Sequence, residues 1–288
     1  MKSSETSQPQ WDSVKQEYEE KLAQTGGFCA HQFETEFGYD DADREAIPQD
    51  ALDSSFGCAN PLAMGILNAG DSVLDLGSGA GMDVILAAKR VGASGKVIGV
   101  DMTGSMIEKA RHNITTAGVG HIAEIRKGVI ESLPVESGSM DWVISNCVVS
   151  LSPDKEQVFS EVQRVLKPGG KMLLTDQVVA PLPGWLRQLV ALKSPASAKA
   201  LDRDRYLQTI TGSGLINVNL RAQLDYDEAM LRSLVEAELN IKVGLVKALR
   251  TFNREQVLSH LLRPMVKPAI RIAANKVSSI KVYAEKPI

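Results

Sequence analysis

The sequence predicts an α/β fold in which a mostly parallel sheet carries helices on both faces. Short apolar strands alternate with amphipathic helices from residue 71 to residue 175, which is typical of such sheets. A glycine-rich turn joins the first strand to the first helix, as in sheets that bind ligands at strand ends. The chain has 288 residues, is 44% hydrophobic and 23% charged, and has a mean hydropathy of -0.08. This length and composition indicate one large globular domain, or one domain with a sizeable elaboration, with a full core.

The elements are expected in the following order. A short amphipathic helix over residues 14–22 belongs to a leader that ends near Pro48. Strands and helices then alternate at residues 73–76, 82–90, 97–100, 104–117, 122–127, 142–145, 155–166 and 171–175. An apolar stretch over 178–192, a helix around 204–211 and strands at 215–220 and 278–284 follow.

Residues 227–275 separate the last two predicted strands and have helical periodicity. Antiparallel neighbours are normally joined by a short loop, so we expect an inserted helical cap here. We therefore divide the chain into a leader and lid at 1–50, a core at 51–178 and a substrate-side region at 179–288.

Charge and composition exclude several functional classes. The net charge of -3 argues against general nucleic-acid binding, although residues 241–288 alone carry ten Lys/Arg and two Asp/Glu. No apolar run reaches the ~18 residues of a membrane span. The polar N-terminus lacks the apolar region of a signal peptide, so we expect a cytoplasmic protein. Three cysteines without a secretory signal predict reduced thiols.

The strongest motif is the glycine-rich turn in VLDLGSGAGMD, residues 73–83. Gly77, Gly79 and Gly81 recur at every second residue between the predicted strand and helix. Glycine permits a tight turn and lets the backbone approach a ligand at a helix N-terminus. The spacing differs from the G-x-G-x-x-G of dinucleotide sites, which accommodates a pyrophosphate.

This turn resembles the first motif of class I S-adenosylmethionine-dependent methyltransferases. The resemblance implies a Rossmann-like, mostly parallel seven-stranded sheet, and S-adenosylmethionine as the cofactor. It places Asp75 near the methionine ammonium, and Asp101, at the end of the next strand, can accept hydrogen bonds from both ribose hydroxyls. The expected cofactor contacts are Asp75, Gly77, Ser78, Gly79, Gly81, Asp101, Met102, Ile130, Glu131 and Asn146.

The three cysteines indicate the chemical class of the methyl acceptor. Cys147 follows the fourth predicted strand, at the sheet edge where ligands bind. The segments FGCANPL (56–62) and VISNCVVSLSPDK (143–155) resemble arsenite methyltransferases, and this similarity is dense over residues 55–176. It implies that Cys58 and Cys147 bind arsenic or take part in its redox cycle, and that Cys29 is an upstream redox cysteine. Trivalent arsenic prefers thiolate ligands. Glutathione or thioredoxin is the expected reductant, and no metal site is expected.

The sequence departs from that family in one respect that leaves the acceptor open. Typical members carry a further cysteine after the fifth strand, but the nearest equivalent here is Ala196, and Phe56 replaces the usual tyrosine. Either fewer protein thiols bind arsenic, or the scaffold is a C-, N- or O-methyltransferase for an apolar or natural-product acceptor. A third alternative is a non-catalytic binder whose basic segment, residues 240–276, faces anionic lipid.

Overall fold

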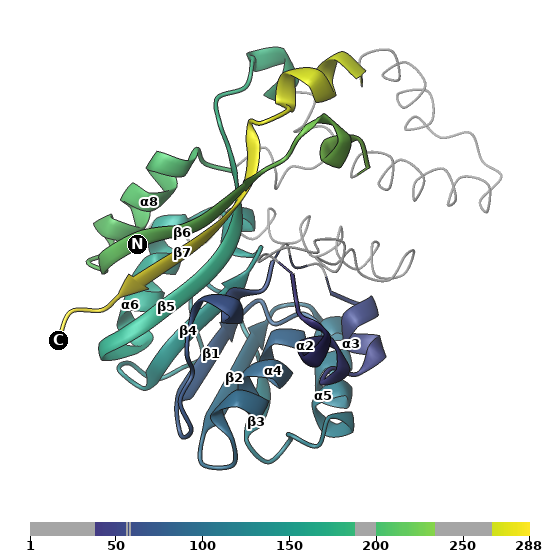
Figure 1. The fold of residues 1–288 in the computed structure, drawn as a ribbon. Helices are drawn as coiled ribbons and strands as arrows, with labels where there is room; N and C mark the ends of the chain where they lie inside the picture. Colours follow the sequence, from purple (N-terminus) through teal and green to yellow (C-terminus); the bar gives the residue numbers. More distant parts are fainter. Residues whose placement is uncertain (1–37, 56, 58, 188–199, 234–266) are drawn as a thin grey trace.

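The computed structural model describes residues 38–55, 57, 59–187, 200–233 and 267–288 (Figure 1). The expected leader helix at 14–22, most of the expected cap at 227–275 and part of the apolar stretch at 178–192 lie outside these residues. The proposed division into three regions therefore stays a prediction.

One seven-stranded sheet organises the described chain, in the order β3-β2-β1-β4-β5-β7-β6. The first five strands are parallel, and β7 runs antiparallel to both β5 and β6. The predicted fold class is thereby confirmed. The strands are β1 (Ser72–Leu76), β2 (Lys96–Asp101), β3 (Ala123–Lys127), β4 (Met140–Asn146), β5 (Leu166–Val179), β6 (Ile216–Asp225) and β7 (Val277–Glu285).

Helices cover both faces of this sheet (Figure 1). Apolar side chains of α4 and α5 form a core on one face, and those of α6 and α8 form a second core on the other. In the second core, Phe159 and Tyr206 pack edge to face with ring centroids 5.7 Å apart. The helices are α2 (Asp41–Glu45), α3 (Gln49–Asp53), η2 (Pro61–Met64), α4 (Met82–Val91), α5 (Gly104–Thr116), η3 (Val149–Leu151), α6 (Lys155–Val165) and α8 (Arg203–Gly212).

The strand order reverses between β1 and β4, which lie side by side at the centre. In open α/β sheets a ligand crevice forms outside the carboxyl ends of the strands at such a switch point. The glycine turn follows β1 and Cys147 follows β4, so the topology brings both to this crevice.

Strand β5 is longer than the predicted strand at 171–175. It extends to Val179 because its last residues pair with β7, down to Val179 opposite Val277. Its partner lies about a hundred residues away in the chain, so local periodicity does not reveal the extension. No helix in the described part of the chain is long and apolar enough to cross a membrane.

Candidate active site

The glycine turn after β1 folds back onto the end of β2. The N–H groups of Gly77 and Ser78 donate to the Val100 carbonyl oxygen at 2.8 and 3.0 Å. Gly77 and Gly79 have φ values of +65° and +49°, which favour glycine. A Cβ at Gly77 would lie 2.5 Å from the Val148 side chain, whereas a Cβ at Gly79 would meet no protein atom within 4 Å. The turn therefore leaves open space in front of Gly79.

Asp101, the last residue of β2, points its carboxylate at this turn. Oδ2 accepts from the Gly79 N–H at 2.9 Å, and Oδ1 accepts from the Thr103 N–H at 2.8 Å. A carboxylate offers about four acceptor positions, so two bonds orient it and leave capacity for hydroxyl donors. Asp101 is thus positioned to bind a diol.

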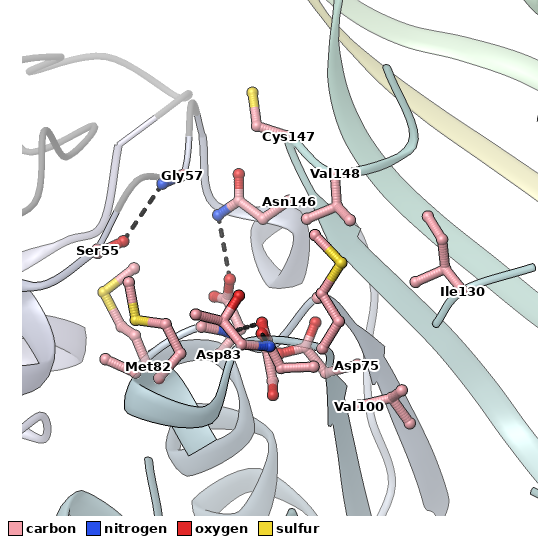
Figure 2. A pocket seen from close by; sticks show the side chains of 18 of the residues that line it. Ser55, Gly57, Asp75, Met82, Asp83, Val100, Ile130, Asn146, Cys147 and Val148 are labelled. Carbon is pink, nitrogen blue, oxygen red and sulfur yellow. Dashed lines mark hydrogen bonds between the residues drawn. The ribbon is translucent and has the colours of Figure 1, made fainter. Parts of the chain in front are cut away.

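A single pocket contains most of the predicted cofactor residues (Figure 2). The space inside the pocket, its open mouth included, is about 910 Å³. Eight of the ten predicted residues line it: Asp75, Gly77, Ser78, Gly79, Asp101, Met102, Ile130 and Asn146.

The other two predicted residues, Gly81 and Glu131, do not line the pocket. Gly81 is the N-cap of α4, and a Cβ there would lie 3.2 Å from the Ala110 side chain of α5, so Gly81 allows the two helices to pack closely. The Glu131 carboxylate accepts a hydrogen bond from the Ser152 hydroxyl instead.

Three carboxylates, the buried Asp75 and Asp83 and the half-buried Asp101, give the pocket its electrostatic character. Burial raises the pKa of Asp75 well above its ordinary value, and the charges of Asp83 and Asp101 raise it further. Burial also raises the pKa of Asp83 to about 6, although hydrogen bonds from Asn146 and Tyr39 oppose the shift. Burial raises the pKa of Asp101, against N–H bonds from Thr103 and Gly79. A cationic ligand would relieve the repulsion among these groups.

Sequence reasoning missed a hydrogen-bond network at the pocket wall. The Tyr39 hydroxyl donates to Asp83 Oδ1 at 2.7 Å. Asn146 Nδ2 donates to Asp83 Oδ2 at 3.0 Å (Figure 2). The Thr175 hydroxyl donates to Asn146 Oδ1 at 2.9 Å. These residues come from four separate segments, so no local motif links them. The one available signal was Asp83 itself, a carboxylate on an otherwise apolar helix face.

Cys147 lines the same pocket, and its side chain lies on the side of Asn146 away from Asp83 (Figure 2). Its φ of +59° is unusual for a non-glycine residue. The Cys147 sulfur forms a disulfide, so the prediction of reduced thiols is wrong for Cys147 in this structure. A count of cysteines does not show which residues the fold brings together. Cys29, Cys58 and Ala196 lie outside the described residues.

The pocket fits the cofactor that the sequence predicts. Asp75 and Asp83 suit the ammonium and sulfonium charges, Asp101 suits a ribose diol, and the space before Gly79 admits a close approach. The Ser78 hydroxyl is buried at the pocket wall without a hydrogen-bond partner in the structure. Within the described part of the chain, no group of three or more His, Cys, Asp or Glu forms a metal site.

Comparison with known proteins agrees with this geometry. Residues 67–228 match the family described as "Methyltransferase domain". An arsenite methyltransferase of Halobacterium salinarum is 42% identical over 205 residues, which are 69% of this chain and 48% of the relative. The chain therefore spans about half the length of that protein. A demethylmenaquinone methyltransferase of Lactobacillus johnsonii is 32% identical over 62% of this chain and 75% of the relative.

A solved structure extends the likeness to three dimensions. The crystal structure of an arsenic(III) S-adenosylmethionine methyltransferase from Chlamydomonas reinhardtii superimposes with a TM-score of 0.65 and 29% identity. The match covers 87% of this chain and 75% of that one. The chain therefore belongs to the S-adenosylmethionine-dependent methyltransferases.

Proposed function

We propose that this protein transfers a methyl group from S-adenosylmethionine to trivalent arsenic held by cysteine thiolates. The observation that carries the proposal is the position of Cys147, which lines the pocket formed by the glycine turn and the three carboxylates. Its arsenite methyltransferase relatives support the choice of acceptor.

Each pocket residue has a separate role in the proposed reaction. When bound, S-adenosylmethionine supplies an electrophilic methyl on a sulfonium. Asp101 would hold the ribose, and Asp75 and Asp83 would balance the cofactor's positive charge. Cys147 would present arsenic so that its lone pair could form a bond to the methyl carbon while the bond from that carbon to the sulfonium sulfur breaks. S-adenosylhomocysteine would leave, and As(III) would become methylated As(V). No general base is needed, because the arsenic carries no proton on the attacking lone pair.

The disulfide at Cys147 must be reduced before the thiolate can bind arsenic. We propose glutathione or thioredoxin as the reductant. The sequence contains no cysteine after Cys147, so an exogenous thiol such as glutathione would complete a three-coordinate arsenic site with Cys58 and Cys147.

A single-turnover assay with methyl-labelled S-adenosylmethionine, arsenite and excess glutathione tests the proposal. We expect labelled arsenic from the wild type, near-background product from Cys58→Ser and Cys147→Ser, and retained activity in Cys29→Ser. S-adenosylhomocysteine calorimetry on each variant serves as a control for a folded cofactor site. Equal arsenic methylation by wild type and Cys147→Ser would refute the role of Cys147.

An organic acceptor is the second candidate. It is favoured by the demethylmenaquinone methyltransferase, of which this chain covers 75%, and by the missing fourth cysteine. If this candidate holds, the same assay will label an added demethylated quinol, and arsenite with excess thiol will stay unlabelled.

A further inference from the structure

The side-chain amide of Asn146 is hydrogen-bonded to both backbone groups of Ala59. Oδ1 accepts from the Ala59 N–H at 3.3 Å, and Nδ2 donates to the Ala59 carbonyl oxygen at 2.6 Å. This pattern imitates the hydrogen-bonded pair of an antiparallel sheet, which fixes both spacing and orientation. It joins the segment before η2 to the carboxyl end of β4, 87 residues further along the chain.

The amide is itself held in place from other elements. Thr175 of β5 donates to Oδ1 at 2.9 Å. Nδ2 lies 2.9 Å from the Tyr39 hydroxyl and 3.0 Å from Asp83 Oδ2 on α4. An amide with partners on several elements has one orientation that satisfies them.

The backbone of Gly57 lies very close to the Asn146 side-chain amide. A Cβ at Gly57 would lie 2.3 Å from Asn146 Nδ2 and 2.7 Å from Cγ. Because the amide is anchored, it cannot swing away without losing its hydrogen bonds. A side chain at position 57 would therefore push the backbone of Gly57 away from β4.

Both ends of this contact are next to a cysteine in the sequence: Ala59 follows Cys58, and Asn146 precedes Cys147. We propose that Asn146 is a positioning residue for the thiol chemistry, because its amide sets the spacing between the end of β4 and the backbones of Gly57 and Ala59. It thereby controls how readily thiols at positions 58 and 147 meet. This inference deepens the proposed function, since it concerns the thiols that would hold arsenic, and its test needs neither arsenite nor cofactor.

The test is a thiol–disulfide equilibrium in a Cys29→Ser background, where Cys58 and Cys147 are the only thiols. The reaction converts two protein thiols and one oxidised glutathione into one protein disulfide and two glutathione molecules. We expect Asn146→Ala to lower its equilibrium constant by about tenfold or more, because the two backbones are no longer fixed together. The alkylation rate of Cys147 in the reduced protein should stay within about twofold of the parent, because the same backbone carries the thiol.

Asn113→Ala is the matched control. Asn113 on α5 is 1% exposed and donates to the Ala80 carbonyl oxygen at 3.0 Å, so its loss also removes a buried amide. We expect its thiol equilibrium to stay within about twofold of the parent. An unchanged equilibrium in Asn146→Ala, or an equal shift in Asn113→Ala, would overturn the proposal.

Gly57→Ala approaches the same contact from the other side and also covers the case in which Asn146→Ala does not fold. Alone, it should lower the equilibrium constant, because its Cβ pushes against Asn146. Added to Asn146→Ala, it should have little further effect, since the clash is gone; full additivity of the two changes would count against the proposal. If arsenic methylation is absent but these shifts occur, the proposed function fails and the positioning role stands.

Discussion

Replacement of Asp101 by alanine should weaken cofactor binding by about ten- to a hundredfold. The carboxylate is fixed by the Gly79 and Thr103 N–H groups at 2.9 and 2.8 Å, and its remaining acceptor capacity faces the pocket. A hydrogen bond to a charged group contributes about 1.5 to 3 kcal/mol, and about 1.4 kcal/mol is tenfold in affinity. Titration calorimetry with S-adenosylhomocysteine measures the effect without turnover, and this ligand retains the ribose.

Asp141→Ala is the matched control, because Asp141 lies at the opposite end of β4. Its carboxylate accepts from the Ser72 N–H at 2.9 Å and from Lys167 Nζ at 2.7 Å, and none of these three residues lines the pocket. We expect its affinity for S-adenosylhomocysteine to stay within about twofold of the wild type. Asp101→Ala binding as tightly as Asp141→Ala would refute the assignment of Asp101 to the ribose.

Three further predictions concern the pocket and the core. Gly77→Ala forces a φ of +65° on alanine and places its Cβ 2.5 Å from Val148, so urea melts should show a loss of about 1–3 kcal/mol. The folded-state pKa of Asp83, about 6, exceeds the ordinary 3.8, so the free energy of unfolding should fall as pH rises from 4 to 6, by about 3 kcal/mol at most. Asp83→Asn should flatten this part of the pH profile, and an unaltered profile would contradict the assignment of the pKa. Phe159→Ala should cost about 3–5 kcal/mol in the same melts, because the ring is fully buried against Tyr206; a loss below about 1 kcal/mol would contradict this packing.

The sheet was predictable because its evidence is local. Each parallel strand is a short apolar run followed by an amphipathic helix, and Gly77, Gly79 and Gly81 mark the turn between the first pair. The antiparallel end of the sheet was predictable only in outline. The length of β5 depends on β7, whose residues lie about a hundred positions further along.

The candidate site was predictable where one residue sits at a strand end. Asp75, Asp101 and Cys147 are positioned by the carboxyl ends of β1, β2 and β4, and all three line the pocket. The contacts of Asn146 with Tyr39, Ala59 and Asp83 were not predictable, since they join segments 63 to 107 residues apart. The disulfide of Cys147 was not predicted either.

The proposed function depends most directly on the position of Cys147 relative to the transferred methyl. A crystal structure of the reduced protein with S-adenosylhomocysteine and arsenite measures it directly. We predict arsenic bonded to the Cys147 sulfur and facing the cofactor sulfur, with the two sulfurs within about 10 Å, which leaves room for a near-attack separation of about 3–3.5 Å between arsenic and a methyl carbon. A Cys147 sulfur farther than about 10 Å from the cofactor sulfur, or arsenic bound elsewhere, would contradict the claim.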